Sequence, residues 1–166
     1  MKNDISSAVN HYFVPFDELM PILQDQLNNG RKVRFSPRGV SMLPMIRQGI
    51  DSVEVSAVQG QLKKYDIALY RRDNGQYILH RVVGVGKTYT CIGDNQFVFE
   101  DGVRQDQLIA VVTSFSRGRN DYSVNHPIYL LYCRIWHYSR KTRWFIKSAV
   151  GYVKRHMRKL FSRLEK

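Results

Sequence analysis

The spacing of apolar residues is first helical and then strand-like. Over residues 16–29 apolar side chains recur every three or four positions, and Gly30 follows as a C-cap, which predicts a helix. Proline is favoured in the first turn of a helix. We therefore expect the helix to begin around Leu19 or Met20, with Pro21 in its first turn.

From residue 31 the chain becomes a series of short β-branched or aromatic runs separated by turn residues. The runs read KVRFSPRG, SVEVSAV, DIALYRR, YILHRVVGV, TYTCIGD and LIAVVTSF. The sequence RRDNGQY at 71–77 predicts a hairpin, because Asn-Gly suits the positive φ angles of a type I′ turn. This pattern is typical of an antiparallel β domain.

A polar linker, SRGRND at 116–121, precedes a mostly helical tail. The expected organisation is mainly β, with a short helical segment over 1–29, a β domain over 30–117 and a basic helical tail over 118–166. The length of 166 residues and the apolar content of 43% suit one globular domain with an appendage.

Cysteine usage and apolar runs limit the class of protein. Cys91 and Cys133 are far apart, so they form neither a metal-type spacing nor a disulfide framework. The N-terminus has no apolar core of a signal peptide, and no apolar run approaches the ~18 residues of a membrane-spanning helix. We expect a protein in a reducing compartment, without a metal or another cofactor.

The charge is concentrated at one end of the chain. Residues 1–125 hold 15 Lys and Arg against 13 Asp and Glu, a net charge of +2. Residues 126–166 hold 11 Lys and Arg against one Glu, a net charge of +10, and the two parts sum to +12. Any basic binding surface therefore belongs to the tail.

Candidate chemistry lies in the β domain. Ser41 sits among apolar residues in RGVSMLPMI, and it is either a turn residue or a nucleophile. His80 is the ionisable group of an alternating apolar strand, so it is either a core histidine or a base. A carboxylate within 94–101 follows. Together, in this order, the three supply a nucleophile, a base and a group that orients the base.

Four segments carry a resemblance to a known family. GVSMLPMIRQGID, KKYDIALYRR, ILHRVVGV and IGDNQ resemble consecutive motifs of signal peptidases of the endoplasmic-reticulum and archaeal type. That family shares its β fold with LexA-like self-cleaving repressors, and the resemblance covers roughly residues 30–115. The base is lysine in the bacterial enzyme and in the repressors, but histidine in the endoplasmic-reticulum type. The resemblance implies Ser41 as nucleophile and His80 as general base.

The loop around Ser41 departs from the family in two places. Ile50 separates Gly49 from Asp51, where the family has Gly-Asp directly. Gly39 stands where the family often has a serine that helps the oxyanion hole. The hole would then depend on backbone N–H groups, including that of Ser41. Two further residues are assigned to this oxyanion loop: Met42 and Pro44.

The acid that orients the histidine is the third departure. The family has two acidic residues about six positions apart around its Gly-Asp-Asn motif. Asp94 matches the first and is our prediction for the orienting acid, with Glu100 and Asp101 as alternatives. The family's N-terminal membrane anchor and a signal peptide both have no counterpart here, so we expect the catalytic domain to stay in the cytoplasm.

The tail combines an apolar stripe with basic residues. The stripe consists of Ile146, Val150, Val153, Met157, Leu160, Phe161 and Leu164. The basic residues off it are Arg140, Lys141, Lys147, Lys154, Arg155, Arg158, Lys159 and Arg163. Such a helix packs on the β domain, lies on an anionic membrane through residues 134–166, or binds nucleic acid. Nucleic acid is not expected, because the stripe would need another partner.

The sequence thus predicts a serine endopeptidase that removes a leader from a peptide or protein precursor by a Ser41–His80 dyad or triad. It would be cytoplasmic and held peripherally at the inner face of the membrane. The alternative is a catalytically silent module that binds peptide, lipid or nucleic acid on the same scaffold. A LexA-like regulator that cuts itself is disfavoured, because no DNA-binding helix pair and no Ala-Gly or Cys-Gly linker precede the β domain.

Overall fold

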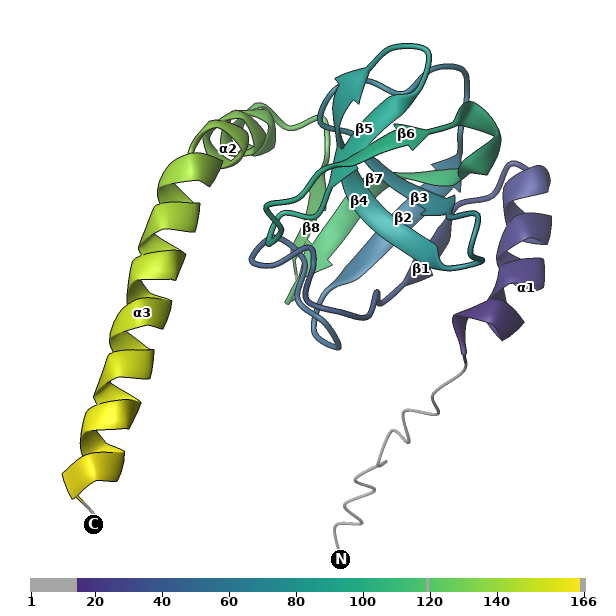
Figure 1. The fold of residues 1–166 in the computed structure, drawn as a ribbon. Helices are drawn as coiled ribbons and strands as arrows, with labels where there is room; N and C mark the ends of the chain where they lie inside the picture. Colours follow the sequence, from purple (N-terminus) through teal and green to yellow (C-terminus); the bar gives the residue numbers. More distant parts are fainter. Residues whose placement is uncertain (1–14, 119, 165–166) are drawn as a thin grey trace, which may run out of the picture.

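The protein is an antiparallel sheet of eight strands with three α-helices (Figure 1). The structure, a computed structural model, describes residues 15–118 and 120–164, without the side chains of residues 155 and 158–164. Residues 1–14 of the predicted N-terminal segment lie outside this description. The helices are α1 Phe16–Asn28, α2 Pro127–Tyr138 and α3 Arg140–Leu164. The strands are β1 Val33–Phe35, β2 Ser52–Ala57, β3 Ile67–Arg71, β4 Tyr77–Val85, β5 Tyr89–Ile92, β6 Glu100–Val103, β7 Leu108–Arg117 and β8 Asn120–Ser123, with a 3₁₀ turn at Gln105–Gln107.

The strands follow the order β1-β2-β7-β3-β4-β5-β6, and β8 also pairs with β7. The long strand β7 is central because it pairs with β2 along one edge and with β3 and then β8 along the other. The predicted hairpin of β3 and β4 is confirmed. Its turn is not type I′, since Gly75 has a φ of +89° but Asn74 has no positive φ. The expectation of positive φ at both turn residues was wrong.

Helix α1 begins earlier than predicted. It starts at Phe16, and Pro21 lies inside it instead of in the first turn. The ring of Phe16 packs against the rings of Phe35 and Tyr77, which accounts for the extra turn at this end. The C-cap prediction is confirmed, since Gly30 has a φ of +71° and the N–H of Arg31 donates to the carbonyl of Gln26.

The main core lies between α1, the loop after β1 and one face of the sheet. Met20, Leu23 and Leu27 of α1 pack there with Val53 and Val55 of β2. A second cluster gathers around β3, β4 and β5 and includes Tyr70, Val82 and Cys91. The loop that carries Ser41 is therefore fixed to a core on one side.

The predicted tail does not begin as a separate element. The predicted linker at 116–121 is wrong, because Ser116 and Arg117 end β7 and pair with Asn120 and Asp121 of β8. Tyr129 and Cys133 of α2 are buried, and both belong to the main core. Helix α3 projects away from the sheet (Figure 1). No helix within the described residues has an apolar stretch long enough to cross a membrane.

Candidate active site

Ser41 lies at the start of a tight turn that its apolar neighbours fix to the core. The N–H of Ile46 donates to the carbonyl of Met42 at 2.9 Å, and the side chains of Met42, Met45 and Ile46 are buried. Their spacing of i, i+3 and i+4 places them on one side of the turn. The apolar residues around Ser41 thus anchor the loop, while Ser41 itself is only half-buried.

Ser41 and His80 line the same cavity. This cavity has a volume of about 100 Å³, and it is bounded by the Ser41 loop and by residues 77–80 of β4. Its other walls include Pro37, Met42 and Ile46. Two residues that lie 39 positions apart in the sequence therefore meet at one hollow.

The Nδ1 atom of His80 faces a hydrogen-bonded chain of side chains. It lies 3.3 Å from the hydroxyl of Tyr70, which donates to Oε2 of Glu100 at 2.7 Å. Arg72 holds Glu100 with two contacts of 2.6 Å. Because the Tyr70 hydrogen is used on Glu100, its oxygen can accept from Nδ1–H, which leaves Nε2 with the lone pair.

Burial decides the protonation of this chain. It lowers the pKa of His80 to about 4, against the opposing attraction of Glu100. Arg72 lowers the pKa of Glu100 by hydrogen bonding, and burial raises the pKa of Tyr70 well above its usual value. At neutral pH the imidazole is therefore neutral, Glu100 is ionised and Tyr70 keeps its proton.

Within the described residues, Ser41 and His80 make no direct hydrogen bond. The cavity brings them together without bonding the hydroxyl to the ring. Nucleophile–base hydrogen bonds are often long without substrate and shorten in the substrate complex. The N–H groups of Ser41 and Met42 donate to no acceptor among the described residues, so both are available for an oxyanion.

The turn at residues 93–95 supports the Ser41 loop. The N–H of Asn95 donates to the carbonyl of Ser41 at 2.8 Å, and its side-chain amide donates to the carbonyl of Val40 at 3.1 Å. A Cβ atom at Gly93 would lie 2.7 Å from the Ser41 carbonyl oxygen. A glycine is therefore required there for the loop to approach this closely.

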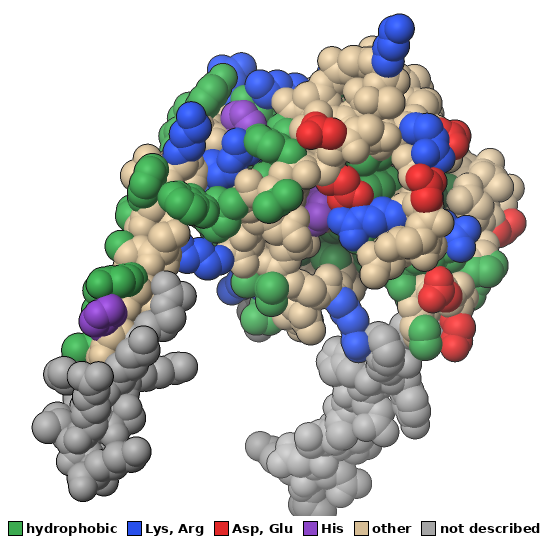
Figure 2. All heavy atoms as spheres, viewed as in Figure 1, with side chains coloured by type: hydrophobic (Ala, Val, Ile, Leu, Met, Phe, Trp, Pro, Cys, Tyr) green, Lys and Arg blue, Asp and Glu red, His purple; other side chains and the backbone are tan. Residues whose placement is uncertain are grey.

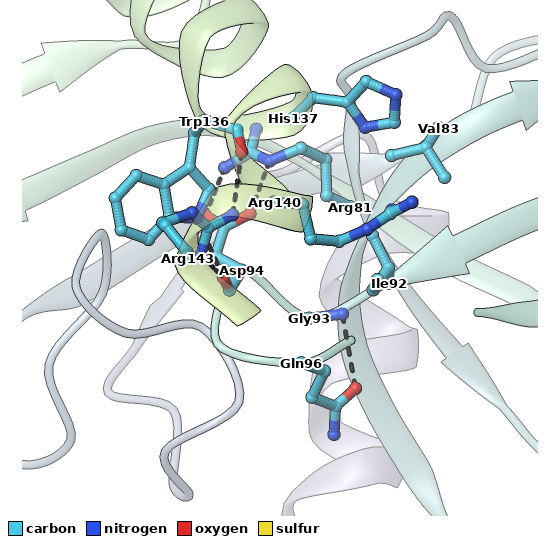
Figure 3. Close-up of a pocket in the computed structure, with 10 residues that line it drawn as sticks. All are labelled: Arg81, Val83, Ile92, Gly93, Asp94, Gln96, Trp136, His137, Arg140 and Arg143. Atoms are coloured by element: carbon cyan, nitrogen blue, oxygen red, sulfur yellow. Dashed lines mark hydrogen bonds and ion pairs between the residues drawn. The ribbon is translucent and has the colours of Figure 1, made fainter. Parts of the chain in front are cut away.

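Asp94 does not contact His80 in the structure. Both of its oxygens pair with Arg81, at 2.8 and 2.7 Å, and both side chains are buried (Figure 3). Arg81 also donates to the hydroxyl of Tyr129 on α2 at 2.7 Å. The geometry favours Glu100, one of the two alternatives, for the orienting position and gives Asp94 a structural contact.

The remaining predicted site residues lie nearby in other roles. Gly39 has a φ of +91°, and its N–H donates to the side chain of Gln48, so it is committed elsewhere. Pro44 is exposed and follows a cis peptide bond. Asp101 is exposed and accepts from Thr90, away from His80. Asp51, after the inserted Ile50, is buried and paired with Arg47, which closes the end of the loop.

Tyr70 and Arg72 were missed as site residues, although the strand pattern contains them. Ala68 is opposite His80 in the β3–β4 pair, so Tyr70 and Arg72 are the next residues on that face of the chain. The hairpin alone therefore gives their proximity to His80. The side-chain directions that join them to Glu100 needed the structure.

Compared with known proteins, the chain matches no family model, no curated sequence and no solved structure. Among the described residues no group of three or more His, Cys, Asp or Glu side chains could hold a metal ion.

Proposed function

We propose that the protein is a serine endopeptidase in which Ser41 is the nucleophile and His80 is the general base. The observation that carries this proposal is the shared cavity of Ser41 and His80, with Nδ1 of the histidine held by Tyr70 and Glu100. A histidine with only a structural role in the core would not be expected to line a cavity opposite a serine.

The chain Tyr70–Glu100–Arg72 orients the base. It stabilises the tautomer with hydrogen on Nδ1, so Nε2 can take the proton of Ser41 Oγ. When the imidazolium forms, the negative charge of Glu100 stabilises it, opposing the effect of burial. Glu100 would thus act on His80 largely through the Tyr70 hydroxyl.

The reaction then has two stages. Oγ attacks the scissile carbonyl as its proton passes to His80, and the N–H groups of Ser41 and Met42 stabilise the oxyanion. The imidazolium gives the proton to the departing amine, which leaves an ester on Ser41. Water, deprotonated by His80, hydrolyses that ester and restores the hydroxyl.

The finer features of the proposal rest on the resemblance. Ser41 in the loop after β1, His80 on β4 and Glu100 on β6 follow one another along a single antiparallel sheet domain, and this order supports a fold of the signal peptidase and LexA-like type. It also supports a substrate that is a peptide or protein precursor with a leader to be removed. A cytoplasmic site for this processing is part of the same proposal.

Covalent labelling tests the nucleophile without a known substrate. A fluorophosphonate should phosphonylate Ser41 Oγ with loss of fluoride, giving one adduct in the intact mass. Ser41→Ala should give none, His80→Ala should react far more slowly, and the control Ser36→Ala, at an exposed serine in the same loop, should react like the wild type. Equal labelling of Ser41→Ala and wild type would exclude Ser41, and no labelling of either would favour the silent binding module.

A further inference from the structure

Among the described residues, helix α3 contacts the β domain through its first turns. Arg143 donates to the carbonyl of Asp94 at 3.2 Å and stacks on the ring of Trp136, and Lys147 contacts the side-chain oxygen of Asn95 at 3.4 Å. Beyond these residues α3 extends away from the sheet (Figure 1). The N-terminal end of α3 is therefore held against the β domain, and the following turns are exposed to solvent.

The described part of the apolar stripe on α3 is exposed. Ile146 and Val153 are 60% and 57% exposed, and Val150 and Met157 are also in contact with solvent. Their spacings of four, three and four residues keep them on one side of the helix. Figure 2 shows hydrophobic side chains along α3. These four residues do not pack on the β domain, so that interpretation of the sequence was wrong for them.

The charge beside the stripe has one sign. Helices α2 and α3, residues 127–164, contain ten Lys and Arg and neither Asp nor Glu. Lys141 and Lys154 lie off the stripe and are exposed. A surface of this kind pairs best with something that is both apolar and anionic.

We propose that α3 lies in the interface of a membrane that contains anionic lipids, with Ile146, Val150, Val153 and Met157 among the acyl chains. The flanking lysines would contact the lipid phosphates. Two other occupants fit less well. A second copy of α3 would bring like charges together, and nucleic acid would leave the apolar stripe in water. This proposal does not depend on the peptidase activity.

The test uses the full chain with sedimentation of two kinds of vesicle, phosphatidylcholine alone and phosphatidylcholine mixed with phosphatidylglycerol. The wild type should bind the mixed vesicles, more weakly as salt rises, and should bind the neutral ones poorly. Ile146→Gln with Val153→Gln, which leaves the charge unchanged, should weaken binding to mixed vesicles by about tenfold or more. The matched control, Ser148→Gln with Gly151→Gln, places the same residue type off the stripe and should bind like wild type.

Four outcomes would overturn the proposal. In the first, the double variant at Ile146 and Val153 binds mixed vesicles as well as the wild type does. In the second, the control variant loses as much binding as that double variant. In the third, no protein binds vesicles, and in the fourth, the wild type binds a DNA duplex more tightly than mixed vesicles. A wild type that is a dimer by sedimentation, and becomes monomeric on substitution without ever binding vesicles, would assign the stripe to a second copy. Labelling of Ser41 by the fluorophosphonate reports on the peptidase separately.

Discussion

The hydroxyl of Tyr70 stands between His80 and Glu100, 3.3 Å from the Nδ1 of the histidine and 2.7 Å from the carboxylate. It replaces the direct carboxylate–imidazole contact of a simple triad, since Glu100 itself is 3.7 Å from Nδ1. The orientation of His80, the proposed base, therefore depends on a residue that lies fully buried in β3.

Tyr70→Phe should reduce kcat by about tenfold and leave KM nearly unchanged, because the ring still packs but no longer accepts from Nδ1–H. Steady-state kinetics on a cleaved peptide would show this. Tyr122→Phe is the control, since Tyr122 stacks on Phe115 and does not line the cavity of Ser41 and His80. A raised KM with unchanged kcat would mean that Tyr70 shapes the binding site instead.

Neutralising Glu100 should affect mainly kcat, whereas neutralising Asp94 should affect mainly stability. Glu100→Gln should lower kcat more than Tyr70→Phe does, at nearly unchanged stability, since Glu100 is partly exposed. Asp94→Asn should destabilise the protein by roughly 3–5 kcal/mol, because it leaves the buried guanidinium of Arg81 without its counter-charge. Thermal unfolding together with kcat separates the two. A stable Asp94→Asn enzyme with very low kcat would return the orienting role to Asp94.

The pKa of His80 predicts activity in mildly acidic solution. Because burial lowers that pKa to about 4, kcat/KM should rise through about pH 4 and stay level toward neutral pH. With an unburied histidine, the rise in kcat/KM would lie near the reference pKa of about 6.5. A limb near pH 6.5 would show that His80 is not buried in the working enzyme.

The same shift has a consequence for folding. Between the unfolded pKa of about 6.5 and the folded value of about 4, the unfolded chain binds more protons, so stability should fall as pH drops through this range. His80 contributes about 3 kcal/mol to the free energy of unfolding at pH values above the unfolded pKa, and this contribution is lost as the pH falls to the folded pKa. Urea unfolding of wild type and His80→Asn at several pH values isolates it, and parallel pH profiles of the two proteins would contradict it.

Gly93→Ala should impair catalysis by displacing the loop that carries Ser41. Its Cβ would lie 2.7 Å from the carbonyl oxygen of Ser41 and 3.0 Å from the Ser41 Cβ, so the serine loop must shift. We expect kcat/KM to fall by about tenfold or more, since small displacements of reacting groups are costly. Gly86→Ala, in the β4–β5 turn with its nearest contact at 3.7 Å, is the matched control and should be neutral. Equal activity in both would show that the loop position is not critical.

The sequence predicted the β sheet, the β3–β4 hairpin and the proximity of Ser41 and His80, because these depend on local patterns and on the order of motifs. It did not predict which acid faces His80. Asp94 and Glu100 are six positions apart on either side of a turn, and the choice depends on their long-range partners Arg81 and Arg72. The burial of α2 was missed for a similar reason. Tyr129 and Cys133 of α2 accept hydrogen bonds from Arg81, and the sequence does not show that Arg81 is buried beside them.

Cleavage itself is the most direct test of the central claim. A peptide library should be digested with wild type, Ser41→Ala, His80→Ala and the double variant, with the products identified by mass spectrometry. We predict cleavage by the wild type alone, and a double variant hardly worse than either single one, because the two residues act as a unit. Cleavage by Ser41→Ala at the wild-type rate, or no cleavage by a folded wild type, would contradict the account.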